Sequence, residues 1–241
     1  DRDILKNHKL RVLTFHRDLP TRFGLIPRFG ESKSIRWFDC EPCYILHVSN
    51  CWEEGDWFVM DGCRSVNPMP KAYGDEGELS HMLAYMRLEA NNYRWRFNLV
   101  TGEVREGDID DLNTEFNKTN PFYGGQKSRY AYHQYIPTHD EGGYTLRFTG
   151  LVKYDNETGK SWRYDYGPGV LGSEAVYAPK LGATRDHEED DGYVVNFVHD
   201  TKDWRSWFCV YDAKDIEHGP IAKVRLPGRV PVSYTHLRAH E

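Results

Sequence analysis

Four side chains of metal-binding type lie close together in the sequence: Cys40, Cys43, His47 and Cys51. Their spacing, C-x2-C-x3-H-x3-C, would suit a tetrahedral zinc site if the segment were a compact loop. The residues from Cys43 to Cys51 have the composition of a β-strand instead, and a strand rises by about 3.3 Å per residue. The two cysteines would then lie about 26 Å apart, so the pattern argues against a shared zinc ion.

Cys40 and Cys43 also have the spacing of a thiol redox pair. Such a pair needs a helix N-terminus to lower the pKa of the first thiol. Pro42 and the strand predicted after it do not supply one. We therefore expect both cysteines to be small structural side chains that are buried or half-buried.

His47 could instead belong to an iron site assembled from several strands. Alternation along its own strand would place Ile45, His47 and Ser49 on one face. If equivalent strands surround a central axis, one inward side chain from each could reach a single ion. Glu115, Glu174 and position 235 follow at steps of 68, 59 and 61 residues, which predicts equivalent inner strands. The chain has 37 acidic residues, so some matches of this kind are expected by chance.

The elements that must position these residues repeat with a regular period. Asn98, Asp155 and Asp212 each stand at the end of a predicted strand and before a turn, and they are 57 residues apart. Strand-rich repeats of this length are typical of β-propellers, with one sheet for each repeat. The alternative is three unrelated hairpins whose turns fall at even intervals by chance.

Composition agrees with an all-β fold. Aromatic residues make up 14% of the 241 residues, which favours sheet, and glycine and proline are scattered as many turns require. One helix is predicted, at 78–89, where apolar residues follow a helical stripe. Strands are predicted at 44–48, 57–60, 93–97, 128–132, 144–148, 150–154, 193–198, 207–210 and 221–226.

Charge and hydropathy exclude other classes of protein. The net charge of −6, without a basic stripe, excludes a nucleic-acid-binding protein. No apolar run is long enough to predict a transmembrane helix. Five cysteines without a regular framework indicate a reducing, cytoplasmic location.

Both ends of the sequence suggest a piece of a longer protein. The chain starts at Asp1 rather than Met, and residues 232–241 (VSYTHLRAHE) resemble the translation of a sequencing-library adapter. We therefore expect a native domain over residues 1–230 and a non-native tail over residues 231–241.

Several blocks, in order along the chain, resemble those of the carotenoid cleavage oxygenase family. The first is the Arg-Phe-Gly-x-x-Pro-Arg sequence at 22–28, and the second surrounds His47. Further blocks lie at 129–132, 192–200 and 224–231, so the resemblance covers about residues 17–231. Several blocks in the same order make the resemblance more specific than any single motif would.

The resemblance implies a seven-bladed β-propeller with a helical cap, of which this chain would form an incomplete part, roughly four blades with one or two short helices. It also implies Fe²⁺ held by four histidines, with glutamates in an outer shell. His47 matches the third histidine, and Glu115 and Glu174 match two of the glutamates. The fourth histidine is expected at position 235, which is Thr235 here. His236 is one residue out of register, and the first two histidines would lie upstream of this chain.

A carboxylate that accepts the free N–H of a ligating histidine fixes its tautomer and strengthens the ligand. We therefore expect Glu115 and Glu174 to bind histidines of other strands rather than to act as acids or bases. The implied reaction is cleavage of a conjugated C=C bond of a carotenoid or apocarotenoid by O₂, giving two carbonyl products. Cleavage of a stilbenoid is the alternative within the family, and a non-catalytic, ligand-binding propeller is the alternative of another class.

The expected partners are an apolar conjugated small molecule and O₂, without nucleic acid. The resemblance also allows peripheral contact with a membrane in the longer protein. With one of four ligands, this chain alone is expected neither to bind iron tightly nor to turn over substrate. Two other features have structural interpretations: His199 as a hydrogen-bonded fold element, and residues 186–191 as an acidic surface loop.

Overall fold

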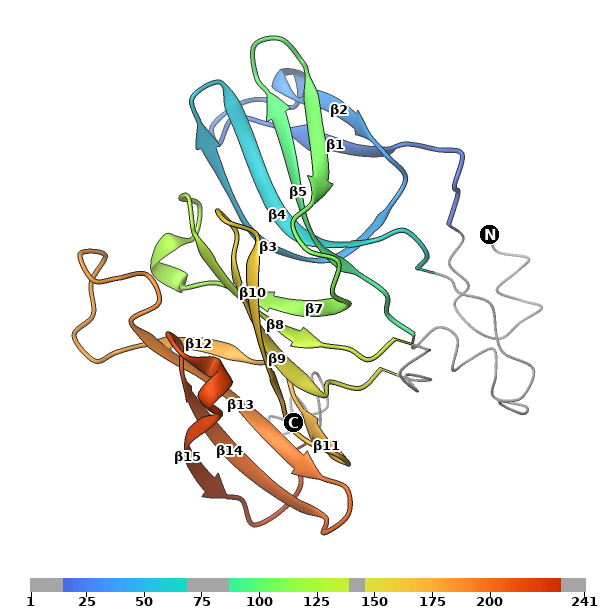
Figure 1. Cartoon of the computed structure of the whole chain (residues 1–241). Coiled ribbons are helices and arrows are strands. Elements are labelled where there is room, and N and C mark those ends of the chain that lie inside the picture. Colours follow the sequence, from blue (N-terminus) through green and yellow to red (C-terminus); the bar gives the residue numbers. More distant parts are fainter. Residues whose placement is uncertain (1–14, 69–86, 139–145, 231–241) are drawn as a thin grey trace, which may run out of the picture.

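The computed structural model describes residues 15–68, 87–138 and 146–230, and within them the chain is all-β (Figure 1). A two-stranded hairpin, β1 (Thr21–Leu25) and β2 (Arg36–Cys40), precedes three larger antiparallel sheets. In the described parts of the chain, three short 3-10 helices lie in the connections: η1 (Ser32–Ser34), η3 (Pro121–Tyr123) and η5 (Ile216–His218). Most of the helix predicted at 78–89 lies outside the described residues, and residues 87–89 are not helical.

The strands of each large sheet are neighbours in the order of the chain, with one small variation in the third. The first sheet contains β3 (Tyr44–Glu54), β4 (Trp57–Ser65), β5 (Asn91–Asn98) and β6 (Val104–Asp108). The second contains β7 (Thr114–Lys118), β8 (Tyr130–Tyr135), β9 (Gly150–Asp155) and β10 (Lys160–Asp165). In the third, β11 (Val170–Gly172) and β12 (Val176–Pro179) both pair with β13 (Gly192–Asp200), which is followed by β14 (Arg205–Asp212) and β15 (Pro220–Arg225).

The predicted 57-residue repeat is confirmed as a repeat of structure. Asn98, Asp155 and Asp212 end β5, β9 and β14, each of which is the last strand but one of its sheet. Each side chain accepts the N–H of the residue two positions on: Val100, Glu157 and Lys214, at 2.9, 3.1 and 2.9 Å. Asx turns of this kind close a hairpin locally, so the sequence alone specified these corners.

Strands with strong apolar alternation were predicted best. The predictions at 44–48, 57–60, 93–97, 150–154, 193–198 and 207–210 lie within β3, β4, β5, β9, β13 and β14, and those at 128–132 and 221–226 overlap β8 and β15. The prediction at 144–148 is wrong for residues 146–148, where only an isolated bridge from Phe148 to Gly172 is present. The prediction missed polar or short strands, including β6, β7 and β10.

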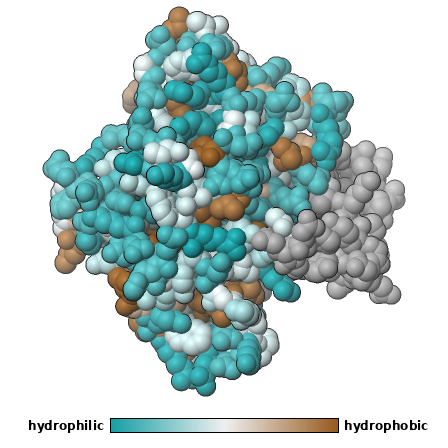
Figure 2. Space-filling view, viewed as in Figure 1, coloured by the Kyte–Doolittle hydropathy of each residue, from teal (hydrophilic) through white to brown (hydrophobic). Residues whose placement is uncertain are grey.

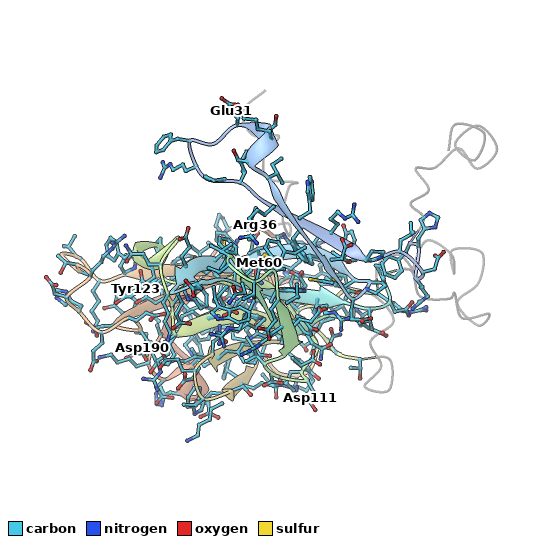
Figure 3. The ribbon with its side chains drawn as sticks, turned by 90° about the horizontal axis from the view of Figure 1, so that it is seen from above. Glu31, Arg36, Met60, Asp111, Tyr123 and Asp190 are labelled. Carbon is cyan, nitrogen blue, oxygen red and sulfur yellow. The ribbon has the colours of Figure 1, made fainter. Side chains whose placement is uncertain are left out.

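Aromatic side chains fix the β1–β2 hairpin on the first sheet. The rings of Phe23 and Phe38 each lie 5.1 Å from the ring of Phe97 on β5. Beyond this contact the connection between the two strands projects away from the sheets: Figure 3 shows Glu31 at its tip and Arg36 near its base. On the face shown in Figure 2, apolar residues are scattered over a surface that is mainly hydrophilic.

Hydrogen bonds of polar side chains join neighbouring sheets. The Asn50 amide on β3 donates to the carbonyls of Tyr123 and Gln126, at 3.0 and 2.7 Å, and so holds the first sheet against the second. Between the second and third sheets, the Glu189 carboxylate accepts the N–H groups of Arg129 and Tyr130. Glu189 is half-buried, so the acidic surface loop expected at 186–191 is in part a packed joint between sheets.

Other expectations fall outside the described residues. The proposed non-native tail, Thr235 and His236 all belong to residues 231–241, whose placement is not described. None of the helices in the described part of the chain has the length and apolar character needed to cross a membrane.

Candidate functional site

The structure brings His47 and Glu115 together, although 68 residues separate them in the sequence. His47 lies on β3 of the first sheet and Glu115 on β7 of the second, and His47 Nδ1 is 2.6 Å from Glu115 Oε2. The Glu115 side chain is completely buried, whereas 31% of the His47 side chain is exposed. The pair therefore joins a buried carboxylate to an imidazole that remains accessible on its other side.

Both strands that carry the pair are irregular at this point. The register of β3 against β4 shifts between Ile45 and Val48, on either side of His47. The register of β7 against β8 shifts between Glu115 and Lys118. Bulges re-aim side chains and are over-represented beside functional sites. Here they turn His47 and Glu115 towards each other across the junction of two sheets.

The hydrogen bond from His47 to Glu115 decides the chemistry of the ring. With Nδ1–H donated to the carboxylate, Nε2 keeps its lone pair and is the nitrogen that can bind a metal. The hydrogen bond to Glu115 raises the pKa of His47 and outweighs the opposing effect of burial. A neutral imidazole oriented by a carboxylate is a suitable ligand for iron.

Three consecutive residues of β7 contact His47. After Glu115, the Phe116 ring lies 4.7 Å from the imidazole, and the Asn117 amide donates to the His47 carbonyl at 3.3 Å. The backbone N–H of Phe116 also donates to Glu115 Oε2. The other carboxylate oxygen, Oε1, is buried and has no hydrogen-bond partner among the described residues. Glu115 is thus held on the oxygen that meets His47.

Glu174 lies in the connection between β11 and β12 and does not contact His47. Its carboxylate forms an ion pair of 2.6 Å with Lys118 on β7, and about a third of each side chain is exposed. Both charges act on His47: Lys118 lowers the pKa of the histidine and Glu174 raises it. Glu174 therefore lies in the same electrostatic neighbourhood, with a lysine rather than a histidine as its partner in the described structure.

Two other histidines have structural surroundings. His133 on β8 is completely buried, and burial lowers its pKa to about 3. Its Nδ1 lies 3.1 Å from Thr114 Oγ1, next to Glu115 in the sequence. His199 Nδ1 lies 2.9 Å from Ser206 Oγ on the neighbouring strand, which fits the expected hydrogen-bonded fold element.

The cysteines near His47 lie among apolar side chains. Cys40 and Cys43 pack in a cluster with Phe38, Met60 and Trp95, and burial raises the pKa of Cys40 to about 12. Burial also raises the pKa values of Cys43 and Cys51. Within the described parts of the chain, no three His, Cys, Asp or Glu side chains come together as a site for an ion. His47 is accordingly a single candidate ligand here.

Sequence reasoning identified His47, Glu115 and Glu174 but missed the contacts of Phe116, Asn117 and Lys118. These residues face the site because β7 is irregular, and periodicity gives no signal for an irregular strand. The sequence of β7, Thr-Glu-Phe-Asn-Lys, is mostly polar, so it did not predict that the strand is buried. Its buried polar side chains contact other strands through Thr114, Glu115 and Asn117, although Glu115 Oε1 and Asn117 Oδ1 have no hydrogen-bond partner among the described residues.

Known proteins that resemble this chain belong to the family that the sequence blocks resemble. Residues 3–236 match the family described as RPE65, Retinal pigment epithelial membrane protein. The chain is 36% identical over 247 residues to Carotenoid 9,10(9',10')-cleavage dioxygenase 1 of Pisum sativum, a match that covers 97% of this chain and 43% of that protein. The chain thus spans less than half the length of this curated relative.

Solved structures resemble this fold over most of the chain. The crystal structure of Pseudomonas brassicacearum lignostilbene dioxygenase matches with a TM-score of 0.77 and 25% identity, covering 96% of this chain and 49% of that chain. A cobalt-substituted Synechocystis ACO matches with a TM-score of 0.75 and 22% identity, covering 90% and 43%. The second likeness bears on the fold alone.

Proposed function

The chain belongs to the RPE65 family, which includes the carotenoid cleavage dioxygenases and has a β-propeller fold, and on this premise we propose that it is part of a non-haem Fe²⁺ dioxygenase. The proposed reaction is cleavage of a conjugated C=C bond with O₂, giving two carbonyl products. The proposal concerns the longer protein, because this chain corresponds to 43% of the pea relative.

The observation that carries the proposal is the His47–Glu115 pair. A 2.6 Å hydrogen bond to a buried carboxylate fixes Nδ1–H of a partly exposed imidazole and leaves Nε2 for a ligand. This arrangement fits one ligand of an all-histidine iron site. A structural histidine in a core, such as His133, is instead fully buried.

Each site residue has a separate part in the proposal. Bound Fe²⁺ would supply the activation of O₂ that the reaction needs. His47 would hold the metal through Nε2, and Glu115 would keep the ring in the required tautomer. Glu174 would do the same for a histidine outside the described residues. In the described structure its carboxylate is paired with Lys118. None of these residues is proposed to transfer a proton to substrate.

The test is the iron content of the longer protein with His47→Ala. We expect the variant to lose bound iron, measured by elemental analysis, while His218→Ala keeps it, because His218 is exposed on η5. Glu115→Gln should weaken iron binding by about 10- to 100-fold, the usual effect of losing the partner of a metal-bound histidine. Full iron occupancy in His47→Ala would refute the assignment.

The favoured substrate class is a carotenoid or apocarotenoid. The 36% identity to the pea carotenoid dioxygenase supports it, and the 25% identity to a lignostilbene dioxygenase supports a stilbenoid as the second candidate. Product analysis of the longer protein with one substrate of each type distinguishes the two. An iron-free longer protein that binds such a molecule unchanged would favour a non-catalytic propeller.

A further inference from the structure

Phe116 combines three features that the roles of His47 and Glu115 do not explain. It follows Glu115 directly on β7, its ring packs on His47, and its backbone is in a conformation that phenylalanine rarely adopts. We propose that Phe116 is a positioning residue for the His47 imidazole. The inference rests on the proposed function of His47 and assigns to Phe116 the orientation of its ring.

The backbone of Phe116 is in the left-handed region, with φ of 55°. Trp204 is the other non-glycine residue with a positive φ in the described parts of the chain. A bulky residue with a positive φ is an outlier, and such strain persists only where the surroundings enforce it. Strained residues of this kind cluster at functional sites, so the conformation of Phe116 points to a functional role.

The strained turn brings both the backbone N–H and the ring of Phe116 to the His47–Glu115 pair. The N–H of Phe116 donates to Oε2 of Glu115, the oxygen that also receives His47 Nδ1. At the same time the Phe116 ring lies against the imidazole, with ring centres 4.7 Å apart and planes at 47°. The turn thus fixes the acceptor of the histidine and one side of its ring together.

Phe116 is itself held from behind. Its ring meets the ring of Phe148 edge to face, with ring centres 4.8 Å apart, and both residues are buried. Phe116 therefore cannot swing away without disturbing this cluster, which also contains Ile136. The neighbouring Asn117 holds the His47 carbonyl, so the backbone and the ring of the histidine are fixed by successive residues.

The alternative is that Phe116 merely fills the core. Two variants remove the ring: Phe116→Gly also relieves the backbone strain, whereas Phe116→Ala keeps it. The orientation of His47 in these variants separates the alternatives. We expect Phe116→Gly to unfold at a higher denaturant concentration than Phe116→Ala. We expect both variants, despite this difference, to lose the fixed orientation of His47.

The orientation is read from the nitrogen spectrum of the His47 ring in ¹⁵N-labelled protein, at a pH where the ring is neutral. The wild type should show a single tautomer with Nδ1 protonated, and both Phe116 variants should show averaged signals of two tautomers. Phe148→Leu is the matched control, since it thins the same cluster without touching His47, and it should keep the wild-type pattern.

Two results would overturn the proposal. One is a single Nδ1–H tautomer in both Phe116→Ala and Phe116→Gly, which would leave Glu115 sufficient by itself. The other is the same loss of the tautomer in Phe148→Leu, which would make the effect one of general packing. Neither result depends on iron, so failure here is distinct from retained iron in His47→Ala, which would refute the proposed function instead.

Discussion

Glu115 and Glu174 occupy similar places in the repeat but opposite environments. Glu115 is completely buried and binds His47, whereas about a third of Glu174 is exposed and its partner is Lys118. The spacing in the sequence predicted the same role for both. The structure shows that only one of the two meets a histidine within the described residues.

The difference shows what a carboxylate needs before it can orient a metal ligand. Glu115 has its acceptor oxygen fixed by Phe116 and lies beside His47, so its geometry is complete within this chain. Glu174 is paired with Lys118, and a lysine ammonium is a point charge on a flexible side chain that does not fix the orientation of the carboxylate. The Glu115 region should therefore be sensitive to substitution, and the Glu174 carboxylate should tolerate it.

The largest expected effect is the loss of stability in Glu115→Ala. Removing this carboxylate breaks a charged hydrogen bond and leaves the buried N–H of Phe116 without its acceptor, which should cost about 3 kcal/mol in the free energy of unfolding. Glu174→Ala breaks only a partly exposed ion pair and should cost less than about 1 kcal/mol. Denaturant unfolding of the two variants measures both values, and equal losses would remove the distinction between the two carboxylates.

The backbone next to Glu174 should be less tolerant than its side chain. A Cβ at Gly172 would lie 2.5 Å from the ring of Tyr166, whose hydroxyl is tied to Gln134 and Asn196. Gly172→Ala should therefore cost about 1–3 kcal/mol through overpacking. Gly107→Ala is the control, because nothing lies within 4 Å of its Cβ position. If both variants unfold alike in denaturant, the close packing beside Glu174 is not important for stability.

The buried layer behind Glu115 predicts a dependence of stability on pH. His133 has a pKa of about 3 in the folded protein, below its usual 6.5, because burial disfavours the charged ring. The unfolded chain therefore binds the extra proton first, and stability present above pH 6.5 should fall as the pH is lowered towards 3. The slope should be at most about 1.4 kcal/mol per pH unit from this residue.

The measurement for His133 is the free energy of unfolding between pH 6.5 and 5. His133→Gln should lose this component of the slope and keep the part due to carboxylates. An unchanged slope in the variant would mean that the histidine already binds its proton in the folded state.

The smallest expected effect is that of Lys118→Met. It removes the partner of Glu174, but both side chains are partly exposed, so the stability should change by less than about 1 kcal/mol. Lys127→Met is the matched control, since Lys127 pairs with Glu54 and Glu157 away from His47. A loss of several kcal/mol in Lys118→Met alone would show that the Glu174 region is as tightly built as that of Glu115.

The amino-acid sequence was enough to predict the all-β class, the strands with strong alternation and the corners after Asn98, Asp155 and Asp212. These features are local: a strand shows its buried face through its own alternation, and an Asx side chain closes a turn through its own backbone. The ordered family blocks also singled out His47, Glu115 and Glu174 before any contact was known.

Which of these residues contact each other follows from the packing of the sheets and not from the sequence pattern. The contact of His47 with Glu115 depends on two bulges and on the packing of two sheets, none of which leaves a periodic signal in the sequence. The strand β7 was missed for the same reason, since its polar residues are buried by partners distant in the chain. Phe116 and Lys118 acquire their places at the site from that strand.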